Sequence, residues 1–177
     1  MRHFSIHGPF SIKKARNGLI DSDSDTLNEF WDKVETAEEG LSSACGCYLF
    51  AVKAAHGIKP WYVGMTSKRS FSAECLGNHQ RNIYNDVIAG RKGTPLLFFI
   101  AKRTKGGKFR KPSRNTLKDI SYLETLLIGA GIEKNSKMQN VQKTKFLRET
   151  IVPGFLNTPQ RRPSEEEQRF TQALFKD

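Results

Sequence analysis

The stretch Gly46-Cys47-Tyr48-Leu49-Phe50 is followed, after a short bridge, by Trp61-Tyr62-Val63-Gly64-Met65-Thr66. Both stretches are rich in apolar, aromatic and β-branched residues, which is typical of buried β-strands. The bridge contains Gly57 and Pro60, which favour a turn and the edge of a sheet. The sequence therefore predicts a β-hairpin that carries a tyrosine in each strand and a glycine close to each tyrosine.

Length, charge and cysteine content narrow the class of protein. At 177 residues the chain is long enough for one compact core, and two full domains would be crowded. Its net charge of +11 favours a polyanionic partner, although many basic proteins simply carry a solvated basic face. No apolar run approaches the length of a membrane-spanning helix, residues 1–20 lack the apolar core of a signal peptide, and three cysteines are an odd number for a disulfide framework. We therefore expect a soluble cytoplasmic protein that does not enter a membrane.

The remaining sequence predicts a small α/β fold of the α+β type, with an antiparallel sheet of about three strands flanked by helices. Residues 96–100 are a fully apolar run that predicts the third strand, and residues 1–20, interrupted by His7-Gly8-Pro9, predict an edge hairpin. Apolar periodicity and capping signals predict helices over residues 27–38, 70–74, 79–89, 116–130 and 146–152, and a last helix after Ser164-Glu165-Glu166-Glu167. We expect Asp25 or Thr26 to cap the first helix, Gly90 and Gly93 to close the third, Gly129 and Gly131 to end the fourth, and Phe170, Ala173 and Leu174 to face inward from the last.

Residues 102–118 form the most basic segment of the chain. Gly106-Gly107 and Pro112 disfavour a helix here, so the segment predicts a loop. Like charges this dense repel one another unless salt or a polyanion screens them. We favour a loop that faces DNA over a merely solvated one, and the candidate DNA-binding residues are Lys68, Arg81, Lys102, Arg103, Lys105, Lys108, Arg110 and Lys111.

Glu124 is placed where a charged residue is unexpected. Leu117, Ile120, Leu127 and Ile128 stand seven and four residues before it and three and four after it, which are the spacings of one helix face. Burying a carboxylate is costly unless it is paired or binds a cation. The spacing alone leaves both a structural ion pair and a metal ligand open.

Tyr48 and Tyr62 also have two interpretations. A tyrosine in a strand is usually part of the core, but a pair at the ends of paired strands, each beside a glycine, leaves room for a ligand. A phenol has a pKa near ~10, so it is a poor base unless a nearby positive charge lowers that value.

The tripeptides Gly46-Cys47-Tyr48 and Tyr62-Val63-Gly64 resemble the two-part signature of the GIY-YIG nuclease superfamily. Glu124 and Asn140 stand where that family places a glutamate in a helix and an asparagine after it. The resemblance implies a catalytic domain over residues 44–145, with an N-terminal extension over 1–43 and a C-terminal helical extension over 146–177 packed on the same domain.

The resemblance also implies a reaction, the hydrolysis of DNA phosphodiester bonds by an endonuclease that depends on Mg²⁺ or Mn²⁺. It implies that Tyr48 takes a proton from the attacking water, Tyr62 orients water or phosphate, Glu124 holds the metal ion, and Asn140 braces the site. The family usually carries an arginine in the helix after the second tyrosine, often followed by a histidine, but residues 72–75 contain no arginine. We assign those two roles to Arg69 and His79, while Lys68 and Arg81 are the other available cations.

Two alternatives stay open at this point. The missing arginine is compatible with a domain of the same fold that binds nucleic acid without cutting it. Cys45, Cys47, Cys75 and His79 could instead hold zinc in a binding module, although their spacings are unusual for such a site. The sequence does not identify the form of the substrate, and it leaves open whether a second copy or a partner subunit supplies specificity.

Overall fold

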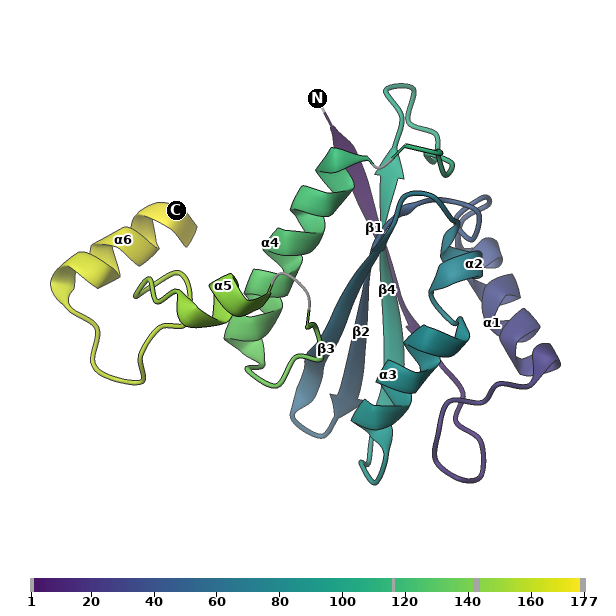
Figure 1. Ribbon diagram of the computed structural model, residues 1–177, viewed down its shortest axis with the longest axis horizontal. Helices are drawn as coiled ribbons and strands as arrows, with labels where there is room; N and C mark the ends of the chain where they lie inside the picture. The colour runs from purple at the N-terminus through teal and green to yellow at the C-terminus, as the bar shows by residue number, and fades with distance from the viewer. Residues whose placement is uncertain (1, 116, 142–143, 176–177) are drawn as a thin grey trace.

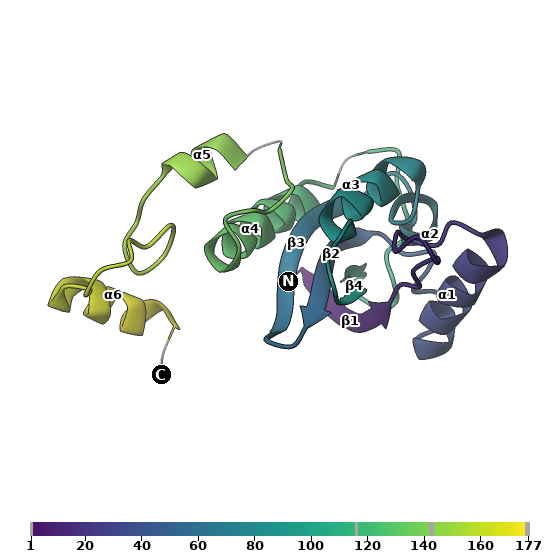
Figure 2. The ribbon, with the colours of Figure 1, turned by 90° about the horizontal axis from the view of Figure 1, so that it is seen from below.

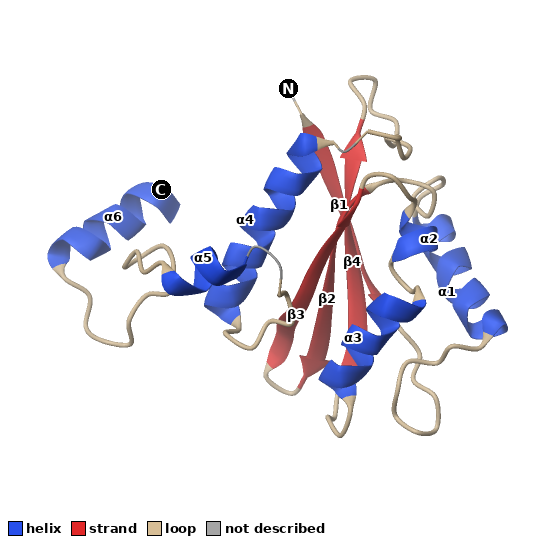
Figure 3. Cartoon of the chain, in the orientation of Figure 1, coloured by secondary structure: helices blue, strands red, loops and turns tan. Residues whose placement is uncertain are grey.

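Four antiparallel strands form one sheet in the computed structural model, which describes residues 2–115, 117–141 and 144–175 (Figures 1 and 3). The strands lie in the order β1-β4-β2-β3. The predicted hairpin is β2 and β3, and the predicted third strand is β4. The prediction of about three strands was incomplete, because β1 adds a fourth at the edge. The bounds are β1 (His3–Ser11), β2 (Gly46–Ala54), β3 (Gly57–Thr66) and β4 (Thr94–Arg103).

The N-terminal segment is one strand, not the predicted hairpin. β1 pairs with β4 along its whole length, and the pairing register shifts between His7 and Phe10. Gly8 has a φ of +111°, and a Cβ there would lie 2.8 Å from the carbonyl oxygen of Leu97. Gly8 and Pro9 therefore lie in a bulge pressed against β4, and the chain turns back only after the strand, where Lys14 and Ile20 form an isolated antiparallel bridge.

Helices cover both faces of the sheet (Figures 1 and 2). One face carries α1 (Ser24–Ala37), α2 (Phe71–Glu74) and α3 (Asn78–Ile88), and the other carries α4 (Lys118–Lys134). α5 (Thr144–Glu149) and α6 (Glu165–Phe175) lie beyond α4, away from the sheet. None of the helices in the described ranges is both long and apolar enough to cross a bilayer.

Several helix boundaries differ from the predictions, among them those of α5, which ends at Glu149 where residues 146–152 were predicted to be helical, and two of the differences have a clear structural reason. Asp23, and not Asp25 or Thr26, caps α1, because its carboxylate accepts hydrogen bonds from the backbone N–H groups of both of those residues. α4 continues through Gly129 and Gly131 to Lys134. A Cβ on Gly131 would lie 2.8 Å from the Cε of Met138, so this glycine gives the following segment room to pack on the helix and does not end it.

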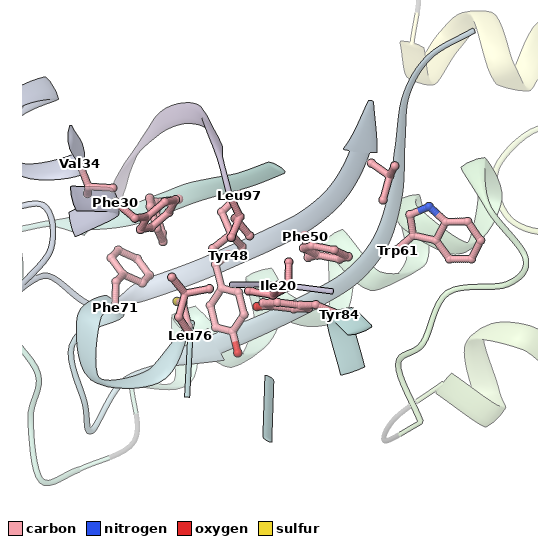
Figure 4. Packing of buried hydrophobic residues seen from close by; sticks show 14 of the residues in the cluster. Ile20, Phe30, Val34, Tyr48, Phe50, Trp61, Phe71, Leu76, Tyr84 and Leu97 are labelled. Carbon is pink, nitrogen blue, oxygen red and sulfur yellow. The ribbon is translucent and has the colours of Figure 1, made fainter. Parts of the chain in front are cut away.

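The larger core lies between the sheet and α1, α2 and α3. Its aromatic side chains pack against one another. The rings of Phe50 and Tyr84 are stacked with their centroids 4.1 Å apart (Figure 4), and the centroids of the Phe71 and Phe99 rings are 4.8 Å apart. The α4 face holds two smaller clusters, one around Cys47 and Ile120 and one around Val63 and Ile128. Tyr48, Phe50 and Tyr62 therefore pack on one face of the sheet, and Cys47, Leu49 and Val63 pack on the other.

The last helix begins as predicted but does not bury the predicted face. The Ser164 hydroxyl accepts from the Glu167 N–H, and the Glu167 carboxylate accepts from the Ser164 N–H, which completes a capping box. Phe170 and Leu174 nevertheless remain 43% and 50% exposed. α6 contacts the turn at Gly154 through Thr171, whose hydroxyl donates to the Gly154 carbonyl, and its Phe175 ring stacks on Phe155 with the ring centroids 6.2 Å apart.

Candidate active site at the edge of the sheet

A cavity of about 640 Å³ lies beside the edge strand β3, between α3 and α4. Five of the six predicted catalytic residues line it, and they come from five separate parts of the chain: Tyr48, Tyr62, His79, Glu124 and Asn140. The sixth, Arg69, does not line the cavity. The other polar side chains in the lining are Glu74, Gln80, Asp86 and Gln139.

The strand pairing explains how the two tyrosines meet. Tyr48 lies opposite Gly64, and Tyr62 lies opposite Phe50, so both tyrosines project from the same face of the sheet. Their ring centroids are 6.2 Å apart. The Tyr48 ring lies directly over Gly64, where a Cβ would overlap the ring and its hydroxyl oxygen. The glycine of the second tripeptide is therefore required for the packing of the tyrosine in the first.

The cavity keeps both phenols protonated near neutral pH. Burial raises the pKa of Tyr48 and of Tyr62, and the nearby acidic groups, including Glu74, raise both values further. A hydrogen bond between Tyr48 and Gln80 lowers the pKa of Tyr48, and one between Tyr48 and Tyr62 lowers the pKa of Tyr62, but these bonds offset only part of the increase. A positive side chain was expected to lower these pKa values, but within the described residues the charged side chains that act on the two phenols are carboxylates.

Glu74 stands in the stretch where the resembling family has its arginine, and it faces the cavity. Its two oxygens accept from Gln80 Nε2 at 2.7 Å and from Arg69 Nη1 at 3.4 Å. Among the described side chains, Glu74 is the residue through which Arg69 is linked to the site. Arg81 donates to the Leu76 carbonyl and to Asn78 at the start of α3. Neither arginine occupies the cavity position expected from the family pattern.

Asn140 seals the open edge of β3. Its Oδ1 accepts from the Val63 N–H at 3.0 Å, and its Nδ2 donates to the Val63 carbonyl at 2.6 Å, as a neighbouring strand would. Val63 lies between Tyr62 and Gly64, so this pair of bonds holds the strand that carries the second tyrosine. The same edge is bonded at the Pro60 carbonyl by Asn135. Sequence reasoning missed Asn135, because a single asparagine in a polar stretch has no distinguishing pattern.

Glu124 projects from α4 toward the same cavity. Ile120 and Ile128, one turn away on either side, are buried. The carboxylate raises the pKa of Tyr62 and of Cys47 in addition to burial, which places its charge near both side chains. Carboxylate oxygens are the ligands that Mg²⁺ prefers, and one or two of them suffice because the ion keeps several waters.

The donor set fits Mg²⁺ or Mn²⁺ held in this open way. Among the described residues, no group of three or more His, Cys, Asp or Glu side chains is close enough to form a complete metal cage. The four predicted zinc ligands do not gather. Cys45 and Cys47 belong to a cluster on the α4 face and donate to the carbonyls of Arg110 and Ile120, whereas Cys75 is buried on the opposite face.

The predicted DNA-binding segment is more ordered than a simple loop. Lys102 and Arg103 are the last residues of β4, and they form ion pairs with Asp119 and Glu38. The Arg103 guanidinium also lies 3.8 Å from the ring centroid of Phe109, at the base of a turn. Of the remaining candidates, Arg81 is partly buried. The others are exposed: Lys68, Lys105, Lys108, Arg110 and Lys111.

Comparison with models of known protein families, with curated proteins and with solved structures finds no match to this chain.

Proposed function

We propose that the chain is a divalent-metal-dependent endonuclease that hydrolyses phosphodiester bonds in DNA, and that it is a divergent member of the GIY-YIG superfamily. One observation carries this proposal: five residues selected from the sequence, and distant along it, line a single cavity. A core tyrosine pair alone would not bring a carboxylate, an imidazole and an edge-sealing asparagine to the same place.

The charges of the cavity support a requirement for a cation. Glu74, Asp86 and Glu124 all face it, and their carboxylates repel a phosphodiester. Glu124 would hold Mg²⁺ or Mn²⁺, and Glu74, which lines the same cavity, is a candidate for a second ligand. When bound, the ion would neutralise charge on the phosphate and on the leaving oxygen and would lower the pKa of the nearby phenols.

The other residues position the reactants. Tyr48, fixed over Gly64, orients the attacking water. It would accept the proton of that water as a phenolate, after its own hydroxyl proton has passed to solvent, which requires the lower pKa that a bound cation would give it. Tyr62, hydrogen-bonded to Tyr48, directs its own hydroxyl toward the phosphate. His79 stabilises negative charge on the phosphate oxygens. Asn140 keeps β3 in place and contacts the backbone on both sides of Val63, so it acts as a positioning residue.

A second candidate function is a nucleic-acid-binding domain of the same fold that does not cut. The observation that favours it is the place of Arg69, which is 64% exposed and paired with Glu74, outside the cavity. Without an arginine at the phosphate, the described side chains offer little positive charge to the transition state. The two functions differ in cleavage and not in binding.

Cleavage of supercoiled plasmid at low salt, with Mg²⁺, Mn²⁺ or EDTA, separates them. We expect metal-dependent nicking, and we expect Glu124→Gln to reduce its rate by about 10³-fold, equivalent to about 4 kcal/mol of transition-state stabilisation. Glu133→Gln, on the same helix but outside the cavity, is the matched control. Tyr48→Phe keeps the ring over Gly64 and should also abolish most activity.

Two outcomes would contradict the nuclease. Nicking that survives Glu124→Gln would show that the cavity is not its source. An absence of nicking with every metal, together with salt-sensitive DNA binding, would support the domain that binds without cutting.

A further inference from the structure

A second cavity, of about 490 Å³, lies at the turn of the β2–β3 hairpin, beside the end of α3. We call it the hairpin cleft. Its described lining contains no acidic side chain, and four cationic side chains line it together with Trp61: Lys59, Arg91, Lys92 and Lys134. These cations were not among the predicted DNA-binding residues.

Two glycines bring Arg91 and Lys92 to the hairpin. Gly90 and Gly93 both have positive φ, +67° and +133°, which makes a tight turn directly after α3. A Cβ on Gly93 would lie 2.8 Å from the Lys53 carbonyl oxygen, so the turn packs closely on β2. The sequence Gly-Arg-Lys-Gly therefore presents two cations at a fixed place and does not only close a helix.

The cations of the hairpin cleft are held without acidic partners. The Arg91 guanidinium lies 4.5 Å from the ring centroid of Trp61 and donates to the Val87 carbonyl at the end of α3. The Lys59 ammonium lies 5.6 Å from the same ring. In the described part of the chain, none of the three lysines or Arg91 forms an ion pair, so their charge is not neutralised.

The hairpin cleft and the candidate active site are neighbours on β3. The register shift between Phe50 and Ala51 leaves Trp61 as an extra residue in the pairing, next to Tyr62. Both side chains therefore pack toward the same core: Tyr62 lines the candidate active site, and Trp61, labelled in Figure 4, lines the hairpin cleft. A polyanion that follows this strand passes from one cavity to the other.

We propose that the hairpin cleft binds the phosphate backbone of the DNA that flanks the scissile bond. The proposal rests on the proposed nuclease function for the place of the scissile bond, but the binding itself does not require cleavage. Unneutralised cations beside a carboxylate-lined cavity give affinity for a polyanion that the candidate active site alone repels. Backbone contacts of this kind carry no sequence preference.

The test measures the binding of a short DNA duplex to the full chain carrying Glu124→Gln, in EDTA, over a series of salt concentrations. Lys59→Ser, Lys92→Ser and Lys134→Ser are combined in one variant, and Arg91 is kept because it packs on Trp61. The matched control removes the same charge from exposed cations elsewhere, with Lys13→Ser, Arg16→Ser and Lys33→Ser. Thermal unfolding of both variants verifies that the fold is intact.

We expect the cleft variant to reduce the slope of log affinity against log salt by about 2.7, or 0.9 for each lost phosphate contact, and to bind at least about tenfold more weakly at low salt. We expect the control to keep the original slope. Equal slopes in the two variants, or no DNA binding by the parent chain at low salt, would overturn the proposal. The proposal would also be overturned if the cleft variant lost binding to anionic lipid vesicles while its DNA binding stayed unchanged, because the cleft would then bind a membrane surface and not DNA.

The two proposals fail in different ways. A chain that binds DNA through the hairpin cleft but never cuts it would refute the nuclease and leave the cleft as a binding surface. A chain whose cleavage depends on Glu124 but whose DNA binding ignores the cleft lysines would refute the cleft and leave the nuclease.

Discussion

Two adjacent cavities on β3 differ in almost every property. The candidate active site is lined by phenols and carboxylates, whereas the hairpin cleft is lined by cations around one tryptophan. Tyr48 is 1% exposed, but most cations of the cleft are exposed at the surface. The first cavity is thus part of the core, and the second is built on its surface.

This difference separates chemistry from affinity. Polar groups in the candidate active site are fixed by close contacts and by bonds to the strand edge, so changing them also changes the stability of the fold. Exposed lysines of the hairpin cleft contribute little to folding, so changing them should alter binding alone. Substitutions of residues that line the candidate active site should therefore change the free energy of unfolding.

The largest expected effect is a loss of stability at high pH. Burial raises the pKa of Tyr48, Tyr62 and Tyr84 in the folded chain above their ordinary value near ~10. The unfolded chain releases these protons near pH ~10 while the folded chain retains them. The stability they contribute is therefore fully present below pH ~10 and falls above it, by about 1.4 kcal/mol per pH unit for each tyrosine. Urea unfolding as a function of pH measures this slope.

Tyr84→Phe provides the control for that slope. Among the described side chains, the Tyr84 hydroxyl is buried without a hydrogen-bond partner, so removing it leaves no other group unsatisfied. In this variant the free energy of unfolding should fall less steeply with pH above pH ~10, by the contribution of one tyrosine, and the fold should not be destabilised at neutral pH. If the absorbance of tyrosinate from all four tyrosines appears while the fold is intact, the cavity is hydrated and the contrast with the cleft is wrong.

The next effect concerns Gly64. Gly64→Ala places a methyl group where the Tyr48 ring lies, so the ring or β3 must move. We expect a loss of about 3 kcal/mol in the free energy of unfolding, at the upper end for overpacking. Gly106→Ala is the control, because a Cβ there meets nothing within 4 Å. If both variants unfold at the same denaturant concentration, the close packing of the Tyr48 ring on Gly64 does not contribute to stability.

The parts predicted from the sequence are those in which local pattern and burial agree. The apolar runs of β2, β3 and β4 identify strands without knowledge of their partners. Glu124 attracts notice because a charge interrupts an apolar helix face. Asn140 was found only through the resemblance, since a loop asparagine is otherwise ordinary.

The parts that were missed depend on contacts between distant residues. The bulge at Gly8 follows from its distance to Leu97, and the passage of α4 through Gly131 follows from the packing of Met138. Lys102 is part of a basic run in the sequence, but in the fold it pairs with Asp119. Arg91 is one ordinary surface residue until Trp61 is found beneath it. The sequence shows how many cations the chain carries, but only the fold shows which of them form ion pairs with carboxylates.

The smallest of the three effects concerns Asn140, and it tests whether the two cavities are independent. Asn140→Ala leaves the N–H and carbonyl of Val63 without their partner at a buried edge, and we expect a loss of about 2 kcal/mol in the free energy of unfolding. Gln139→Ala is the control, because its exposed amide donates only to the Lys137 carbonyl. A loss no larger than that of the control would show that the strand edge is held by other groups.

DNA binding by the same Asn140 variant, measured over the same salt series, completes this test. If β3 is a rigid support, the variant keeps the salt slope of the parent chain while cleavage falls, because the hairpin cleft is anchored separately by Trp61 and the turn after α3. If the slope falls together with cleavage, loosening the strand at Val63 disturbs both cavities. The two cavities would then depend on the same ordered edge of β3, and they would differ in charge but not in their dependence on that strand.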